Sequence, residues 1–221
     1  MSDPAYRFSL GPWNLGQGAD PFGPPVRPAV SFDDVLEAAV ALGFEGIQFH
    51  DDDAVPDLER LSPTAIATQA EAMRRRLADR GLVAEFVAPR LWEHEHGIDG
   101  GYTANDTAAR RWAIERSKRA VDVAAALGTD LIVLWPAREG TAVRESKDPI
   151  RASGQLLEAI DAMLAASPPI RLAIEPKPNE PVDHAFLPTI GHALALGARA
   201  ADPARDYEAL ERLVLEHLLG C

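Results

Sequence analysis

Residues 106–135, DTAARRWAIERSKRAVDVAAALGTDLIVLW, decide the fold because they hold a complete helix followed by a strand. In the first part the apolar residues are spaced three or four apart, which is typical of one face of an α-helix. Gly128 stands where such a helix ends. The last part, 130–135, is a short apolar run of the kind found in strands that helices cover. The stretch therefore predicts one long helix that leads into one buried strand.

The same alternation of strand and helix runs through most of the chain. The other strands are expected at four apolar stretches, 6–10, 46–49, 82–88 and 170–175. The other helices are expected where a serine or proline precedes apolar residues at helical spacing, at 31–42, 62–80 and 153–166. Strands joined by helices of this length indicate βαβ units and a parallel sheet. The pattern predicts an α/β fold, a partial TIM-type (β/α) barrel of about five parallel strands with outer helices, where a closed barrel needs eight.

The rhythm changes after Glu175. The following residues are rich in proline, and only 189–196 show a short helical pattern. A final amphipathic helix is expected at 207–219. We therefore expect one partial barrel domain over residues 1–200, followed by a C-terminal helical segment, 201–221, that packs on the barrel or contacts another subunit.

Composition restricts the class of partner. The formal net charge is −12, so no basic surface exists to attract nucleic acid or an anionic membrane. No stretch of about 18 apolar residues suggests a membrane span, and the N-terminus does not resemble a signal peptide. Cys221 is the only cysteine, which excludes an intrachain disulfide and suits a reducing compartment. We expect a cytoplasmic protein that binds neither nucleic acid nor membrane.

Residues 46–56, GIQFHDDDAVP, place a histidine and three aspartates directly after an expected strand. In a β/α barrel, functional residues lie where strands end and the following loops begin. If Asp53 folds back onto the His50 imidazole, it fixes the tautomer and stabilises the imidazolium, which suits a general acid or base. The alternative is a histidine at a strand end, followed by an acidic loop that caps a helix.

Three further groups follow expected strand ends. In EPKPNEP, 175–181, Glu175 ends a buried strand and needs a cation, which is either a divalent ion or a basic side chain such as Lys177. Trp92 and Trp135 either form two walls of a sugar pocket or belong to the core. The HEH stretch at 94–96 is either part of a zinc site or an ordinary acidic loop.

Several long motifs follow one another along the chain: FSLGPWNLGQGADPFGPPVRP, FHDDDAVP, DGGYTAND, REG, IEPKPNEP and LPTIGHALA. Together, and in this order, they resemble xylose isomerase of the actinobacterial type. The resemblance extends from about residue 7 to residue 195, and the last residues look like that family's final helix. The resemblance implies a (β/α)8 barrel that interconverts an aldose and a ketose, D-xylose and D-xylulose, with glucose as a possible second sugar.

The resemblance also implies roles for the polar residues. His50 would help to open the sugar ring, with Asp53 as its orienting partner. Lys177 would hydrogen-bond the carbonyl oxygen of the substrate. Glu175 would bind the first of two divalent ions, usually magnesium (Mg²⁺), manganese (Mn²⁺) or cobalt (Co²⁺), which polarise the sugar oxygens and assist a hydride shift between C1 and C2.

The aromatic residues are assigned by the same resemblance. Trp13, Trp92 and Trp135 would form the walls of the sugar pocket. Phe22 would reach into the site of a neighbouring subunit, because the family forms tetramers. A homo-oligomer, dimeric or tetrameric, is therefore expected.

The sequence also departs from the family pattern. Family chains are much longer, and the missing part would supply the later strands and most metal ligands, so only Glu175 of that set remains. Pro136 and Ala137 replace paired glycines, Trp92 replaces a phenylalanine, and 89–91 differ as well. A part-barrel would also leave strand edges unpaired, which favours association with another chain. The alternatives to an active oligomeric isomerase are a sugar-binding or metal-binding homologue without turnover, and an interaction partner of full-length isomerase.

Overall fold

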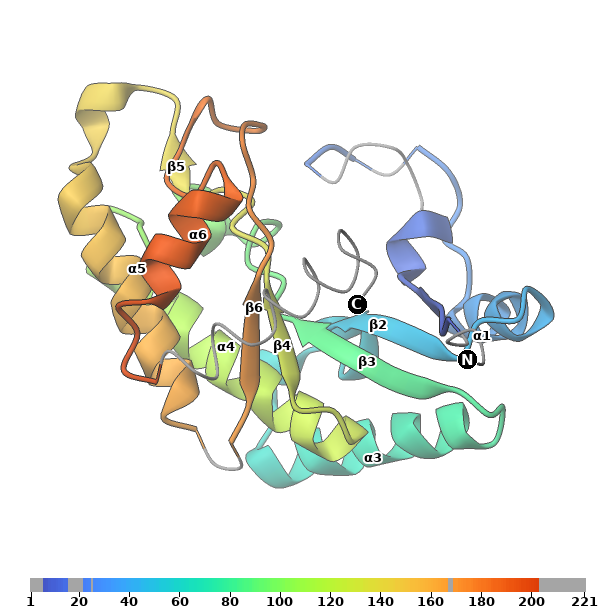
Figure 1. Ribbon diagram of the computed structural model, residues 1–221. Coiled ribbons are helices and arrows are strands. Elements are labelled where there is room, and N and C mark those ends of the chain that lie inside the picture. Colours follow the sequence, from blue (N-terminus) through green and yellow to red (C-terminus); the bar gives the residue numbers. More distant parts are fainter. Residues whose placement is uncertain (1–5, 16–21, 25, 167–168, 203–221) are drawn as a thin grey trace, which may run out of the picture. The chain divides into compact units, whose positions relative to one another are not determined.

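The computed structural model describes residues 6–15, 22–24, 26–166 and 169–202, and within them five strands form one sheet. The strand order is β1-β2-β3-β4-β6, and β1 with β2 and β4 with β6 pair in parallel. These strands are, in chain order, Ser9–Leu10, Gly46–His50, Val83–Ala88, Leu131–Leu134 and Arg171–Ile174 (Figure 1). This order is typical of a β/α barrel, in which each strand lies beside the strand that precedes it in the sequence. The predicted α/β fold, a partial TIM-type barrel of five parallel strands, is confirmed.

The chain divides into two compact units. The first combines residues 1–87 with 122–129. Within it, β2 is followed by a one-turn helix α2, Asp51–Ala54, and the helices α1, Phe32–Ala41, and α3, Pro63–Ala78, lie where the sequence predicts them. Their N-caps are the expected serines, which accept hydrogen bonds from backbone amides in the first turn. Fully buried side chains from strands and helices make up the core, among them Leu36, Ile47, Phe49, Ile66 and Leu77.

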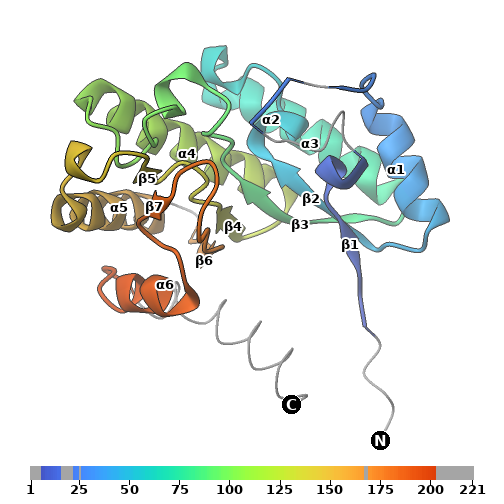
Figure 2. The ribbon, with the colours of Figure 1, turned by 90° about the horizontal axis from the view of Figure 1, so that it is seen from above.

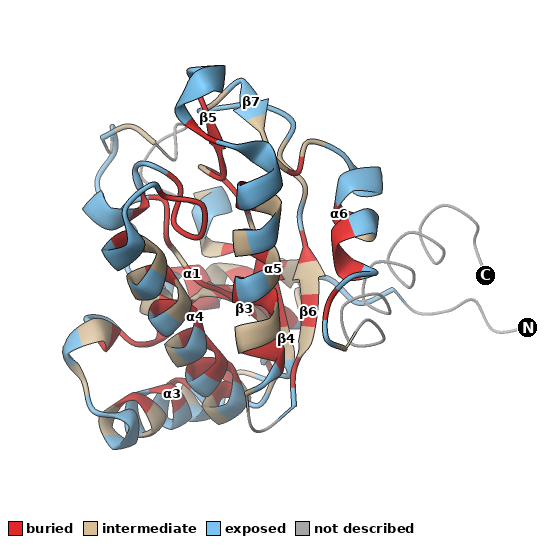
Figure 3. Ribbon diagram, turned by 90° about the vertical axis from the view of Figure 1, so that its left-hand side faces the viewer, coloured by how far each residue is buried: buried red, intermediate tan, exposed pale blue. Residues whose placement is uncertain are grey.

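The second unit combines residues 88–121 with 130–221 and holds β4 and β6. Most of α4, Thr107–Leu127, belongs to it, together with α5, Pro149–Leu164, and α6, Ile190–Gly197. The helix α5 packs against β6 and α6, and buried and exposed stretches alternate along it (Figure 3). The side chains that it buries include Leu156, Ile160 and Met163. Apolar contacts of these helices with the two strands form the core of this unit.

The first strand and the start of α5 differ most from the sequence prediction. The first strand is limited to β1, Ser9–Leu10, within the expected stretch 6–10. The helix α5 begins at Pro149, four residues earlier than expected. Asp148 caps it, because its side chain accepts hydrogen bonds from the amides of Ile150 and Arg151. A proline in the first turn needs no amide hydrogen bond, so an Asp-Pro pair is a strong helix start.

A second, two-stranded sheet lies outside the predicted pattern. Its strands are β5, Gly140–Thr141, and β7, His184–Ala185, which pair antiparallel and lie side by side in Figure 2. The strand β7 falls in the proline-rich segment that follows β6. Short 3-10 helices complete the described elements, at Pro12–Leu15, Leu58–Arg60, Glu95–Gly97 and Arg144–Ser146.

The predicted C-terminal helix at 207–219 lies outside the described residues. The expected boundary between 1–200 and 201–221 therefore stays a prediction. Among the helices of the described residues, none is long and apolar enough to cross a membrane.

Candidate functional site

His50 and Asp53 lie together in the first unit. His50 is the last residue of β2, and Asp53 lies within α2, which begins at the next residue. The amide of His50 donates a hydrogen bond to Oδ2 of Asp53 at 3.0 Å, and Nδ1 of the imidazole lies 3.2 Å from the same oxygen. Both side chains are largely buried, with 12% and 17% of their surface exposed. The Asp53 carboxylate therefore both contacts the His50 imidazole, as predicted, and caps the start of α2.

Trp13 covers the imidazole of His50. The two ring centroids are 4.6 Å apart, with the planes tilted by 40°. Gly11 makes this position possible, because a Cβ on Gly11 would lie 2.3 Å from Cε2 of Trp13, far inside contact distance. The indole is also partly exposed, so one part of its surface is open to a ligand. Phe22 is also partly exposed, and its predicted role in the site of a neighbouring subunit stays a prediction.

Trp135, Trp92 and Lys177 form a cluster in the second unit. Trp135 directly follows β4, and its ring meets Trp92 edge to face with centroids 4.5 Å apart. Trp92 is buried, whereas Trp135 is partly exposed. The Nζ atom of Lys177 lies 5.2 Å from the Trp135 ring centroid, which is within the range of a cation–π interaction. Trp92 therefore supports Trp135, and Trp135 presents both an aromatic surface and a neighbouring cation.

Glu175 follows β6 at the same end of the paired strands. Its amide donates a hydrogen bond to the carbonyl oxygen of Leu134, the last residue of β4, at 2.9 Å. The residue is exposed, yet the chain packed around its carboxyl partly desolvates it and raises its pKa above the usual range. The positive charge of Lys177 acts in the opposite direction. The Lys177 Nζ atom lies 3.4 Å from an oxygen of exposed Glu180, a weak contact in water.

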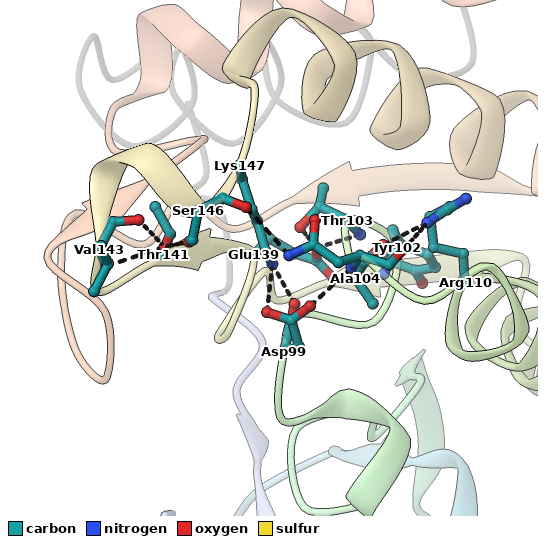
Figure 4. Close-up of polar contacts among 11 residues, drawn as sticks. Asp99, Tyr102, Thr103, Ala104, Arg110, Glu139, Thr141, Val143, Ser146 and Lys147 are labelled. Carbon is teal, nitrogen blue, oxygen red and sulfur yellow. Dashed lines mark hydrogen bonds and ion pairs between the residues drawn. The ribbon is translucent and has the colours of Figure 1, made fainter.

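Sequence reasoning missed a buried acid, Glu139, that organises this unit (Figure 4). Its carboxylate accepts hydrogen bonds from the amides of Tyr102 and Thr103, both at 2.9 Å, and from the Thr103 hydroxyl at 2.6 Å. Burial raises its pKa, while these hydrogen bonds and the charge of Lys147 oppose the rise. Glu139 lies in the REG motif and its donors lie in DGGYTAND, so the motifs were visible in the sequence although their contact was not.

Lys147 and Arg138 each donate a hydrogen bond to a backbone carbonyl oxygen in the segment between β3 and α4. The buried Lys147 ammonium donates to the carbonyl oxygen of Asp99 and lies 3.2 Å from its carboxylate. Nε of Arg138 donates to the carbonyl oxygen of Trp92 at 2.8 Å. A cavity of about 20 Å³ between the tryptophans, Arg138 and Glu139 has room for about one water molecule.

The HEH stretch has local structural roles. Nδ1 of His94 accepts a hydrogen bond from the amide of His96 at 3.2 Å, and the His94 ring stacks on Trp112 with centroids 4.5 Å apart. Within residues 6–15, 22–24, 26–166 and 169–202, no group of three or more His, Cys, Asp or Glu side chains is placed to hold a metal ion. The geometry favours the reading of this stretch as an ordinary loop.

The groups around Glu175 supply few of the ligands that a divalent ion needs. Mg²⁺ needs about six oxygen ligands in octahedral geometry, several of which are usually water. Glu175 offers one carboxylate, and the Lys177 ammonium beside it disfavours a second positive charge. The described residues of this chain therefore do not fit a complete metal centre by themselves.

The parallel strand order and the positions of His50, Trp135 and Glu175 at strand ends define a protein of the β/α barrel class. Comparison with known families agrees and is more specific. Residues 36–204 match the family described as xylose isomerase-like TIM barrel. The chain belongs to this family.

Solved structures show the same fold. A protein from Sinorhizobium meliloti has 28% sequence identity and a TM-score of 0.51, with 76% of this chain and 54% of that chain covered. A xylose isomerase-like TIM barrel protein from Mycobacterium smegmatis, solved in complex with magnesium, has 19% identity and a TM-score of 0.51 over 86% and 59%. The 3-keto-D-glucoside 4-epimerase from E. coli has 12% identity and a TM-score of 0.55 over 74% and 57%. The chain thus spans little more than half the length of these proteins.

Proposed function

We propose that the chain acts as a sugar isomerase of the xylose isomerase type, which interconverts D-xylose and D-xylulose as a homo-oligomer. The observation that carries this proposal is the cluster at the ends of β4 and β6. There, the Lys177 ammonium lies 5.2 Å from the Trp135 ring, next to the carboxyl of Glu175. An aromatic surface suits the C–H face of a sugar, and an ammonium beside it suits a carbonyl oxygen.

Each side chain has a role in this reaction. His50, oriented by Asp53, would move the proton that opens the sugar ring, a task that suits an imidazole. Lys177 would donate a hydrogen bond to the carbonyl oxygen, where negative charge develops as hydrogen passes between C2 and C1. Trp135 and Trp13 would bind the sugar and exclude water.

A second chain would complete the site. Glu175 would contribute one carboxylate to a divalent ion, Mg²⁺, Mn²⁺ or Co²⁺, and the partner would contribute the other ligands and receive Phe22. The magnesium in the M. smegmatis relative supports a divalent ion at this position. We expect a dimer or tetramer in the cytoplasm, without nucleic acid or membrane partners, as the charge of −12 suggests.

The second candidate function is sugar binding without turnover, or association with full-length isomerase. The incomplete ligand set around Glu175 in the described part of the chain favours it. An assay of ketose formation from D-xylose, with and without Mg²⁺, Mn²⁺ or Co²⁺, separates the two functions. Sedimentation of the protein, alone and with a full-length isomerase, separates self-association from association with the longer enzyme.

The variants make the assay specific. Lys177→Met, Glu175→Gln and His50→Ala should each reduce kcat/KM by about 100-fold or more, because each removes a group that acts on the reacting atoms or holds the divalent ion. Lys118→Met is the matched control, since Lys118 pairs with Glu115 on exposed α4 surface. No metal-dependent turnover in the native chain, or native turnover in all three variants, would refute the isomerase proposal.

A further inference from the structure

The position of Lys177 depends on the short strand β7. The amide of Lys177 donates a hydrogen bond to the carbonyl oxygen of Leu187 at 3.1 Å, which closes the loop 177–187 at its base. The amide of Phe186 donates to the carbonyl oxygen of Glu139 at 3.0 Å. Two antiparallel residue pairs, Gly140 with Ala185 and Thr141 with His184, continue this contact. The backbone of residues 177–187, called the lysine loop below, is therefore held against β5.

The turn that precedes β5 fixes the position of this strand. The amide of Glu139 donates to the carbonyl oxygen of Pro136 at 3.2 Å, so the chain turns immediately after Trp135. The Glu139 carboxylate is buried and accepts three hydrogen bonds from Tyr102 and Thr103. One short segment, 135–141, thus carries the aromatic ring at one end and holds the lysine loop at the other.

Gly140 is the residue of β5 at which the backbone of β7 comes very close. A Cβ on Gly140 would lie 2.6 Å from the carbonyl oxygen of His184, 2.7 Å from Cγ2 of Val182 and 2.9 Å from Cα of Ala185. All three distances are shorter than real Cβ contacts, and two of the three atoms belong to the backbone. Rotation of a side chain cannot relieve those two contacts, so any side chain here would displace β7 from β5.

We propose that Gly140 is a positioning residue for Lys177, which holds the loop 177–187 so that the lysine ammonium lies over the Trp135 ring. The absent side chain allows β7 to pack against β5, and the β5–β7 pair sets the distance between cation and ring. The role of Lys177 in catalysis rests on the proposed isomerase function. The positioning itself is a property of the loop and is measurable without turnover.

The test compares Gly140→Ala with Gly154→Ala. Gly154 lies in α5 of the same unit, and a Cβ there would meet no atom within 4 Å. Each variant is treated with limiting acetic anhydride, and acetylation of each lysine is followed by mass spectrometry. The chain has three lysines whose side chains differ in exposure: 46% for Lys118, 19% for Lys177 and 3% for Lys147. Lys118 therefore serves as the rate standard, and slow acetylation of Lys147 shows that the unit is folded.

In Gly140→Ala, the acetylation rate of Lys177 relative to Lys118 should change by about threefold or more, because the ammonium leaves its place over the ring. Gly154→Ala should keep the native ratio. A native ratio in Gly140→Ala with Lys147 still protected would overturn the proposal.

If Lys147 becomes as reactive as Lys118, the variant has unfolded, and amide hydrogen exchange of the native chain decides the question. The amides of Lys177 and Phe186 should then exchange about tenfold or more slowly than that of exposed Asn179. Equal rates would refute the positioning. Because neither measurement uses a sugar, an inactive native chain with the expected lysine ratios would refute the isomerase proposal alone.

Discussion

Replacement of Glu139 by alanine tests the buried network of the second unit most directly. The Glu139 residue is 3% exposed, and its carboxylate is the acceptor for two backbone amides and one hydroxyl. Thr103 and Tyr102 are also buried, at 2% and 5% exposure. In Glu139→Ala these donors lose their acceptor in a region that water enters poorly.

The magnitude follows from the number of donors. Each buried donor without a partner costs about 1–3 kcal/mol, so three donors at about 1–2 kcal/mol each cost about 3–6 kcal/mol. Loss of the buried carboxyl group offsets roughly 1 kcal/mol of this cost. We expect Glu139→Ala to lower the free energy of unfolding by about 2–5 kcal/mol, a large share of the roughly 5–15 kcal/mol of a typical domain. Glu139→Gln keeps one acceptor oxygen and should lose about 2 kcal/mol.

The assay is urea unfolding followed by tryptophan fluorescence. The matched control is Glu145→Ala, because Glu145 is an exposed acid on the same segment and should change the free energy by no more than about 0.5 kcal/mol. Equal midpoints for Glu139→Ala and Glu145→Ala, with unchanged slopes, would refute the assigned role of the network.

The remaining predictions concern pH and helix capping. Burial raises the pKa of Glu139, so the folded state binds the Glu139 proton more tightly than the unfolded chain does. Glu139 therefore makes the free energy of unfolding fall as the pH rises from its ordinary pKa of 4.5 through the raised pKa. Glu139→Gln should remove this pH dependence from the free energy of unfolding measured in urea. The guanidinium of Arg171 holds the pKa of Asp130 below its ordinary value, so this pair stabilises the fold above about pH 3.8 and less as pH falls through the lowered pKa. Asp130→Asn should cost no more than about 1 kcal/mol at pH 7, because both groups are partly exposed, and an NMR titration of Asp130 that showed an ordinary pKa would contradict the assignment. Ser62→Ala should destabilise the chain by about 1 kcal/mol through loss of the α3 cap, whereas Ser153→Ala inside α5 should cost less; equal melting temperatures for the two variants would argue against the cap.

The sequence alone determined the alternation of strands and helices. This signal is local, because apolar spacing and caps such as Ser31 and Ser62 act within one or two turns. The placement of His50 and Glu175 at strand ends followed from the same rhythm. The His50–Asp53 contact was also accessible, because three residues across the start of a helix bring a side chain back to the preceding backbone.

Only the tertiary structure decided which side chains at the strand ends lie together and what supports them. The lysine loop is held by β5, and a pairing of two residues per strand has too little pattern to be found in a sequence. Glu139 became a buried acceptor because a distant loop folds over it, and nothing in its own neighbours distinguishes it from an exposed acid. Periodicity is set by each residue's near neighbours, whereas burial and close backbone approach depend on segments that meet only when the chain is folded.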